Sequence, residues 1–210
     1  MNKKKLRKKY LYMRKSISQD KIIKMSYEIF LHLKKMFFIW EKTYYHIFLP
    51  IREYKEVDTF IIINFLLKMG KCVTIPCSNF KELSIENCFF HEKTILTKKK
   101  YGILEPIQRH KFIVSISLIE VIFIPLLIFD FKGHRIGYGK GFYDRFITLC
   151  KKNVIKIGLS IFPPIKKIER VHKNDLFLDI GITPNHIYCF RKNSIKKNFE
   201  NIPNNNKHHN

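Results

Sequence analysis

A run of apolar residues, IEVIFIPL at 119–126, narrows the folds open to this chain more than any other segment. The run is continuous and rich in β-branched side chains. A strand with one face in water alternates apolar and polar residues, whereas a strand covered on both faces reads as an unbroken apolar run. Such strands belong to parallel sheets that are covered by helices. We therefore expect residues 119–126 to form a central, fully buried strand.

Helical and strand patterns alternate on both sides of this run. Apolar residues recur with helical spacing in 3–15 and again after Ser18, where a helix cap should begin a helix of roughly two dozen residues with Ile22, Leu33 and Phe37 on its apolar face. Further elements follow from the same patterns: helices at 57–70 and 141–151, and strands at 43–49, 71–76, 83–90, 154–160, 177–183 and 186–190.

The segment 97–106 contains Gly102 and Pro106 and is expected to be a loop. The alternation as a whole predicts an α/β fold, a single layered α/β/α domain with a mostly parallel central sheet, over residues 1–191. Residues 192–210 are rich in Asn and Lys and poor in apolar side chains. We expect them to be a disordered basic tail.

The cysteines predict free thiols rather than a metal site or a disulfide framework. They are odd in number and scattered, without a C-x-x-C pair, at Cys72, Cys77, Cys88, Cys150 and Cys189. Buried free thiols are typical of a reducing compartment, so we expect a cytoplasmic protein. No stretch of 18 apolar residues occurs, and the basic N-terminus is not followed by an apolar segment, so neither a membrane span nor a secretory signal is expected.

The net charge of +23, from 40 Lys and Arg against 17 Asp and Glu, would attract polyanions. It keeps a basic RNA-binding module open as an alternative function. The lysines are spread along the whole chain rather than gathered in one segment. We therefore expect no dedicated nucleic-acid partner.

A second feature is the stretch GHRIGYGKGFYDRF, from Gly133 to Phe146, which holds half of the 8 glycines. It follows the expected central strand, and ligands of open α/β sheets bind beyond the carboxyl ends of strands. Glycines at 137, 139 and 141 would let backbone N–H groups approach phosphate oxygens, and the helix start that follows adds a partial positive charge. We expect a phosphate-binding segment rather than a tight turn that only reverses the chain.

Two common phosphate-binding patterns do not fit this stretch. A dinucleotide fingerprint counted from Gly137 would need a third glycine where Phe142 stands, and a P-loop would need glycine in place of His134 and Ser or Thr in place of Gly141. A phosphoryl-transfer protein with a different glycine segment therefore remains a second alternative.

The longer segment IPLLIFDFKGHRIGYGKGFYDRF resembles the signature of the 5-formyltetrahydrofolate cyclo-ligase family, also called methenyltetrahydrofolate synthetases. Three further segments resemble family motifs in the same order. They are KKKLRKKYLYMRKSIS near the N-terminus, FLPIREYKEVDT around Glu56, and YGILEP at 101–106; HKNDLFLD resembles the closing segment. The resemblance covers roughly residues 3–190.

The resemblance implies an ATP- and Mg²⁺-dependent ligase that converts 5-formyltetrahydrofolate to 5,10-methenyltetrahydrofolate and releases ADP and phosphate. The formyl oxygen would be phosphorylated, and N10 would then close the ring. The partners implied are ATP and 5-formyltetrahydrofolate, with or without a polyglutamate tail, and we expect a monomer.

The resemblance also implies roles for individual residues. The catalytic residues would be Lys140, Tyr143 and Arg145, and the metal ligands Asp144 and Asp175. The folate would contact Ile51, Glu56 and Tyr101, with the Glu56 carboxylate accepting hydrogen bonds from the pterin. ATP would contact Lys3, Lys4, Arg7, Arg135, Gly137, Tyr138, Gly139, Lys140, Gly141, Phe142 and Tyr143.

Overall fold

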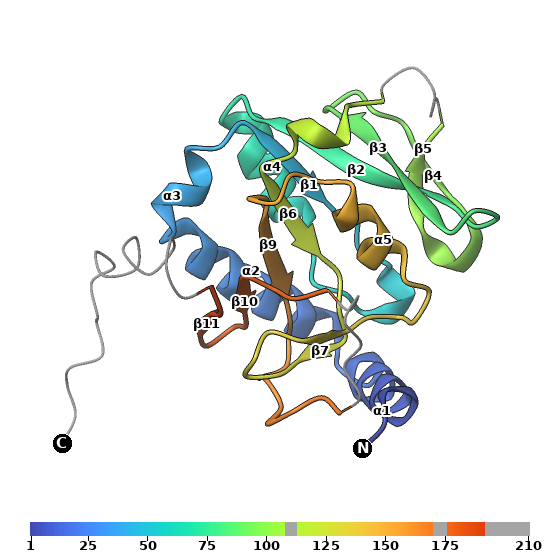
Figure 1. The fold of residues 1–210 in the computed structure, drawn as a ribbon, viewed down its shortest axis with the longest axis vertical. Coiled ribbons are helices and arrows are strands. Elements are labelled where there is room, and N and C mark those ends of the chain that lie inside the picture. Colours follow the sequence, from blue (N-terminus) through green and yellow to red (C-terminus); the bar gives the residue numbers. More distant parts are fainter. Residues whose placement is uncertain (108–112, 170–175, 192–210) are drawn as a thin grey trace.

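The computed structural model describes residues 1–107, 113–169 and 176–191. Seven of its strands form one sheet, in the order β11-β10-β9-β6-β1-β2-β3 (Figure 1). Their bounds are β1 Tyr44–Ile47, β2 Cys72–Asn79, β3 Ser84–Phe90, β6 Val121–Ile124, β9 Ile155–Leu159, β10 Ile180–Ile182 and β11 Ile187–Cys189. The inner pairs are parallel, and only the edge pairs β2–β3 and β10–β11 are antiparallel. The predicted mostly parallel sheet is confirmed.

Strand β6 is the middle strand of this sheet, as the apolar run predicted. All four of its side chains are fully buried. Val121 pairs with Tyr45 of β1 on one side and with Ile155 of β9 on the other. The strand ends at Ile124 because Pro125 has no N–H to donate to a neighbouring strand.

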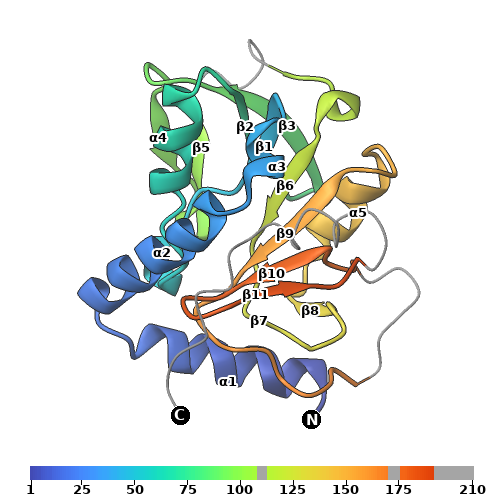
Figure 2. The same cartoon turned by 90° about the vertical axis from the view of Figure 1, so that its left-hand side faces the viewer.

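Helices cover both faces of the sheet, which confirms the layered α/β/α arrangement. Their bounds are α1 Lys3–Lys15, α2 Gln19–Lys34, α3 Phe37–Trp40, α4 Phe60–Lys68 and α5 Phe142–Thr148. Figure 2 shows α2 and α4 on one side of the strands, α5 on the other, and α1 lying across one end of the molecule. Helix α4 packs on β2, α2 packs on β10, and α5 packs against β3.

The second helix is shorter than the sequence suggested. Its cap is the expected one, because the Ser18 side chain accepts a hydrogen bond from the Lys21 N–H. The helix ends at Lys34, however, and the turn that follows buries Met36 completely and leaves Phe37 77% exposed. The prediction that Phe37 belongs to the apolar face was therefore wrong, since the turn breaks the helical phase before that residue.

Other boundaries also moved. The expected helices at 57–70 and 141–151 shrink to α4 and α5. At α4 the preceding Thr59 is held by a hydrogen bond from its Oγ1 to the Phe48 carbonyl. The expected loop at 97–106 contains a two-stranded sheet, β4 Leu96–Lys98 with β5 Leu104–Pro106. A second small hairpin, β7 Ile128–Phe129 with β8 Arg135–Ile136, leads into the glycine stretch.

The prediction that all cysteines are free was wrong. Cys77 and Cys88 form a disulfide between β2 and β3, with their Cα atoms 6.4 Å apart. The antiparallel pairing places Cys88 opposite Ile75, two residues from Cys77, so the two sulfur atoms lie on the same face. Cys72, Cys150 and Cys189 are free, and Cys189 is exposed rather than buried.

None of the helices in the described part of the chain is both long and apolar enough to span a bilayer. The expected tail at 192–210 lies outside the described residues.

Candidate active site

The main cleft of the described structure has a volume of about 460 Å³ and lies at the carboxyl ends of β1 and β6. Its floor contains Phe48 and Leu49, which follow β1, and Pro125, which follows β6. Its walls come from α1, β2 and the glycine stretch. The edge of the sheet that the sequence predicted for ligand binding is therefore the edge that carries the cleft.

Nearly all of the predicted site residues line this one cleft, although they come from segments far apart in the sequence. The lining includes Lys3, Arg7, Ile51, Glu56, Tyr101, Arg135, Gly137, Tyr138, Gly139, Lys140, Gly141, Phe142, Tyr143 and Asp144.

Three predicted residues do not fall in this group. Lys4 is exposed on the next position of α1 and does not line the cleft. Arg145 is also exposed, and its guanidinium donates to the carbonyls of Leu83, at 2.8 Å, and Lys140, at 2.7 Å. The structure therefore gives Arg145 the role of a brace between the glycine stretch and the start of β3. Asp175 lies outside the described residues.

Three glycines each lie against an arginine. A Cβ atom would stand 2.5 Å from Arg135 Nη1 at Gly137, 3.0 Å from Arg7 Cζ at Gly139, and 3.0 Å from Arg145 Nη1 at Gly141. Gly139 and Gly141 also have positive φ values, +90° and +70°, which L-amino acids rarely adopt. Because these glycines have no side chain, three guanidinium groups can lie against the main chain. The sequence did not reveal this use of the glycines.

The result is a cationic end of the cleft. Arg7 reaches across from α1 and donates from Nε to the Gly137 carbonyl at 3.1 Å. Lys3 and Lys140 line the same end. Asp144, in the first turn of α5, accepts hydrogen bonds at Oδ1 from Arg135 Nη2 and from the Leu176 N–H, both at 3.1 Å. Cations around one carboxylate suit a polyanion that also carries a divalent metal.

The other end of the cleft is apolar and aromatic. Phe80 contacts Tyr101, with 5.5 Å between ring centroids, and Phe142, with 5.3 Å. Tyr101 stands at the mouth, half exposed, in a left-handed conformation with φ +64°. These rings pack against one another and present apolar surface to the cleft, against which a flat aromatic ligand can pack.

Glu56 is the acidic group of this apolar end, and only 4% of it is exposed. Its Oε2 accepts a hydrogen bond from the Ile51 N–H at 2.7 Å, and its Oε1 accepts one from the Tyr138 hydroxyl. Burial raises the pKa of Glu56, and the charge of Arg14 together with these hydrogen bonds opposes the rise.

Two residues of the site were missed by sequence reasoning. Arg14 is 3% exposed and donates from Nη2 to the Tyr138 hydroxyl. The available signal was its position on α1, seven residues after Arg7 and on the same face as the buried Tyr10. His46 on β1 lies beneath the cleft, and no sequence pattern marked it.

His46 supports Tyr143 from below. Its Nδ1 lies 2.7 Å from Asn87 Oδ1, and its Nε2 lies 3.4 Å from the Tyr143 hydroxyl. Asn87 donates its own amide to the Val114 carbonyl, so Nδ1–H is the donor to Asn87 and Nε2 is an acceptor. Burial lowers the pKa of His46 to about 4 and raises that of Tyr143, so both side chains are neutral near pH 7.

No group of three or more His, Cys, Asp or Glu side chains that could hold a metal occurs within residues 1–107, 113–169 and 176–191.

Comparison with known proteins gives one consistent family. Residues 1–176 match the model described as the 5-formyltetrahydrofolate cyclo-ligase family. A Schizosaccharomyces pombe protein named probable 5-formyltetrahydrofolate cyclo-ligase is 32% identical over 147 residues, which are 63% of this chain and 71% of that protein. The Haemophilus influenzae 5-formyltetrahydrofolate cyclo-ligase is 30% identical over 107 residues, 50% of this chain and 57% of the relative.

Two solved structures share the fold. The NMR structure of Aquifex aeolicus 5,10-methenyltetrahydrofolate synthetase superposes with a TM-score of 0.75 at 24% identity and covers 100% of both chains. A 5,10-methenyltetrahydrofolate synthetase from Mycoplasma pneumoniae superposes with a TM-score of 0.65 at 21% identity, covering 88% of this chain and 99% of that one.

Proposed function

Because the chain belongs to the 5-formyltetrahydrofolate cyclo-ligase family, we propose that it uses ATP and Mg²⁺ to convert 5-formyltetrahydrofolate to 5,10-methenyltetrahydrofolate, releasing ADP and phosphate. The observation that carries this proposal is the division of one cleft into a cationic end beside Gly137–Gly141 and an aromatic end beside Glu56. A nucleoside triphosphate suits the cationic end, and a flat pterin with a hydrogen-bond donor edge suits the aromatic end.

The reaction has one chemical difficulty. The formyl oxygen on N5 is a poor leaving group, so N10 cannot displace it directly. In the proposed sequence this oxygen attacks the γ-phosphorus of ATP and ADP leaves. N10 then attacks the activated formyl carbon, the carbon–oxygen bond breaks to release phosphate, and N10 loses its proton. Catalysis of such a transfer depends on positioning and on neutralising the phosphate charge.

The cationic residues would supply both. Arg7 and Lys3 would contact the phosphates from α1, and Lys140 would add a point charge from the glycine stretch. Gly139 adds no side chain of its own, and the Arg7 guanidinium lies against it, so a phosphate bound by Arg7 would lie beside the N–H groups of the stretch. Tyr143, held by His46, is a buried residue of the cleft lining.

Asp144 would hold Mg²⁺ together with phosphate oxygens and water. Its place among the cations of the cleft fits that ion, which commonly uses one or two carboxylates. When bound, the metal would neutralise charge on the phosphates. Asp175 remains a proposed second ligand.

Glu56 would accept hydrogen bonds from the pterin, with the ring lying among Phe80, Tyr101 and Phe142. A carboxylate has about four acceptor positions. Oε1 and Oε2 can therefore each keep their present partner and still accept a bond from a ligand. Ile51 would line the same end of the cleft.

The test is to mix the purified chain with 5-formyltetrahydrofolate and Mg·ATP and to follow the near-ultraviolet absorbance of the methenyl product. We expect a rise that requires both substrates and the metal. Thermal unfolding with each ligand separates the alternatives, since only ligands of the native state raise the Tm. A shift with Mg·ATP but none with the folate would favour another phosphoryl-transfer reaction, and a shift with RNA alone would favour a nucleic-acid-binding protein.

A further inference from the structure

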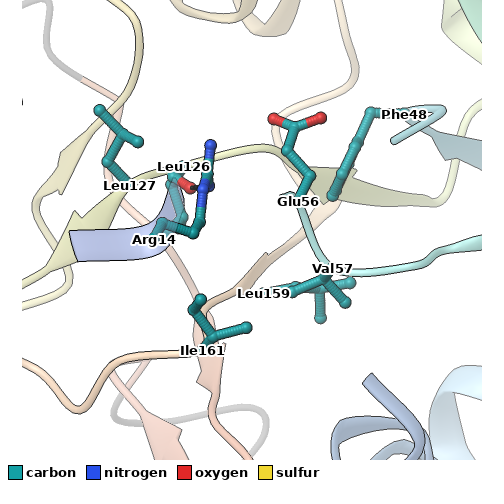
Figure 3. Close-up of a pocket in the computed structure, with 8 residues that line it drawn as sticks. All are labelled: Arg14, Phe48, Glu56, Val57, Leu126, Leu127, Leu159 and Ile161. Atoms are coloured by element: carbon teal, nitrogen blue, oxygen red, sulfur yellow. Dashed lines mark hydrogen bonds between the residues drawn. The ribbon is translucent and has the colours of Figure 1, made fainter. Parts of the chain in front are cut away.

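A continuous chain of hydrogen bonds runs from Arg14 of α1 through Tyr138 of the glycine stretch to Glu56. Arg14 donates from Nη2 to the Tyr138 hydroxyl, and this hydroxyl donates to Oε1 of Glu56. Arg14 is itself fixed by two backbone carbonyls, that of Tyr54 at 2.6 Å and that of Leu126 at 3.0 Å. Figure 3 shows Arg14 beside Leu126, with its guanidinium and the Glu56 carboxylate directed away from Leu159 and Ile161.

The two ends of this chain of bonds are buried, whereas Tyr138 between them lines the cleft. Arg14 is 3% exposed and Glu56 is 4% exposed. The narrow gap between them, closed by Phe48, Val57 and other apolar side chains, has no room for a water molecule (Figure 3). In such surroundings a hydrogen bond depends strongly on geometry, because no solvent can replace a lost partner.

Tyr138 is the residue of this chain of bonds that can transmit a movement of the glycine stretch to Glu56. Its main chain lies between Gly137 and Gly139, where the triphosphate is proposed to bind, whereas its hydroxyl lies on Glu56 at the folate end. Arg7 also bonds to the Gly137 carbonyl, so an anion that draws Arg7 inward acts on the residue next to Tyr138. A shift of the main chain at 137–139 therefore moves the hydroxyl that orients Glu56.

We propose that Arg14 and Tyr138 are positioning residues that couple the two ends of the cleft, so that a nucleotide at the glycine stretch orients Glu56 for the folate. The same hydrogen bonds must work in reverse, because coupling between two binding sites is reciprocal. A bound folate then raises the affinity for the nucleotide by the same factor. This inference rests on the proposed function, since it takes the two ends of the cleft to be the nucleotide and folate sites.

The test is isothermal titration calorimetry with two probes, 5-formyltetrahydrofolate and an ATP analogue that has a methylene group between its β- and γ-phosphorus atoms, with Mg²⁺ present. Each probe is titrated alone and then in the presence of the other. The ratio of the two Kd values for one probe is the coupling factor. For the wild-type chain we expect a factor of about 5 to 150 in favour of the ternary complex, the usual range for coupled sites.

Tyr138→Phe removes the hydroxyl and keeps the ring, which packs on Tyr54 at 5.4 Å. We expect its coupling factor to fall to within twofold of 1. Arg14→Lys should do the same, because one ammonium group cannot keep the fork of contacts to Tyr54, Leu126 and Tyr138. If Arg14→Lys fails to fold, Tyr138→Phe decides the question alone.

Matched controls come from the exposed face of α1. Tyr12→Phe removes a tyrosine hydroxyl and Lys8→Gln removes a positive charge, and neither residue lines the cleft. Both variants should keep the wild-type coupling factor.

A wild-type chain that binds both probes with a coupling factor of 1 would overturn the inference and leave the proposed function standing. A Tyr138→Phe variant that keeps the wild-type factor would overturn it too, whatever happens to its single-probe affinities. A folded wild-type chain that binds neither probe, or that gives no methenyl product, would instead contradict the proposed function.

Discussion

Gly139 offers a direct test of the role given to the glycine stretch. In a Gly139→Ala variant the new Cβ would lie 3.0 Å from Arg7 Cζ and 3.1 Å from Arg7 Nε. The backbone would be strained as well, because φ is +90° at this position. Since the atoms it meets are the far end of a flexible side chain, the protein can relieve the contact by moving Arg7. That movement should weaken the hydrogen bond from Arg7 to the Gly137 carbonyl.

The backbone strain and the displacement of Arg7 differ in energy and are measured by different experiments. Backbone strain at a left-handed position costs about 1–2 kcal/mol of stability for an L-amino acid. Displacement of Arg7 would remove the charge-assisted contact that Arg7 is proposed to make with the nucleotide, which would be worth about 1.5–3 kcal/mol. At about 1.4 kcal/mol per tenfold change, the KM for ATP should rise roughly 10- to 100-fold.

Gly70 provides the matched control. It also has a positive φ, +67°, but a Cβ there would meet nothing within 4 Å. Gly70→Ala should therefore lose a similar amount of stability in urea unfolding and keep the wild-type KM for ATP. Steady-state rates of methenyl production at varied ATP concentration give the KM for ATP of each variant. A folded Gly139→Ala variant whose KM for ATP stays within twofold of that of Gly70→Ala would refute the reasoning.

Three further outcomes are expected. Asp144→Asn should abolish turnover but keep the Tm within a few degrees, because an amide oxygen can still accept from the Leu176 N–H; near-normal turnover would exclude the metal role. Burial lowers the pKa of His46 from 6.5 to about 4, so the unfolded chain binds this proton first as the pH falls. The free energy of unfolding therefore has its full value above pH 6.5 and declines by up to about 3 kcal/mol toward pH 4. His46→Gln should flatten this decline in urea unfolding at several pH values, and an unchanged pH dependence would contradict the neutral, buried state of His46. Under non-reducing conditions iodoacetamide should label Cys189 first and Cys150 slowly, since burial raises the pKa of Cys150 to about 11; equal labelling rates, read by mass spectrometry, would argue against this exposure.

The central part of the fold could be predicted because its signal is local. The apolar run at 119–126 carries its own burial pattern, and the structure places it as the middle strand. The ends of helices were harder to predict, because they depend on tertiary contacts. Phe37 continues an apolar spacing in the sequence, but burial of Met36 after the end of α2 turns Phe37 toward solvent. No local pattern distinguishes these two side chains.

The disulfide shows the same limit. Cys77 and Cys88 are 11 residues apart, a separation with no meaning until β2 and β3 are paired. Only the register of that pairing brings the two sulfur atoms to one face. The small β4–β5 sheet was missed for a related reason, since a short strand within 97–106 is defined by its partner rather than by its own side chains.

The candidate site divides in a similar way. Most residues predicted from the recognisable segments line one cleft, whereas Arg14 and His46 act through side chains of distant segments. Arg14 lies 124 residues from Tyr138 along the chain. A buried arginine on an otherwise basic helix looks like any of its neighbours until the packing of α1 shows which one points inward.

The alternation in Gly137-Tyr138-Gly139-Lys140-Gly141 acquires a physical reason from these contacts. Tyr138 points into the protein and holds Glu56, whereas Lys140 is exposed at the opening of the cleft. The glycines between them leave the main chain bare for the arginines and for an anion. One segment would thereby face both proposed substrates, as the proposed transfer between them requires. Substitutions at the glycines should therefore act first on the KM for ATP, whereas loss of the Tyr138 hydroxyl should act on how strongly each substrate promotes binding of the other.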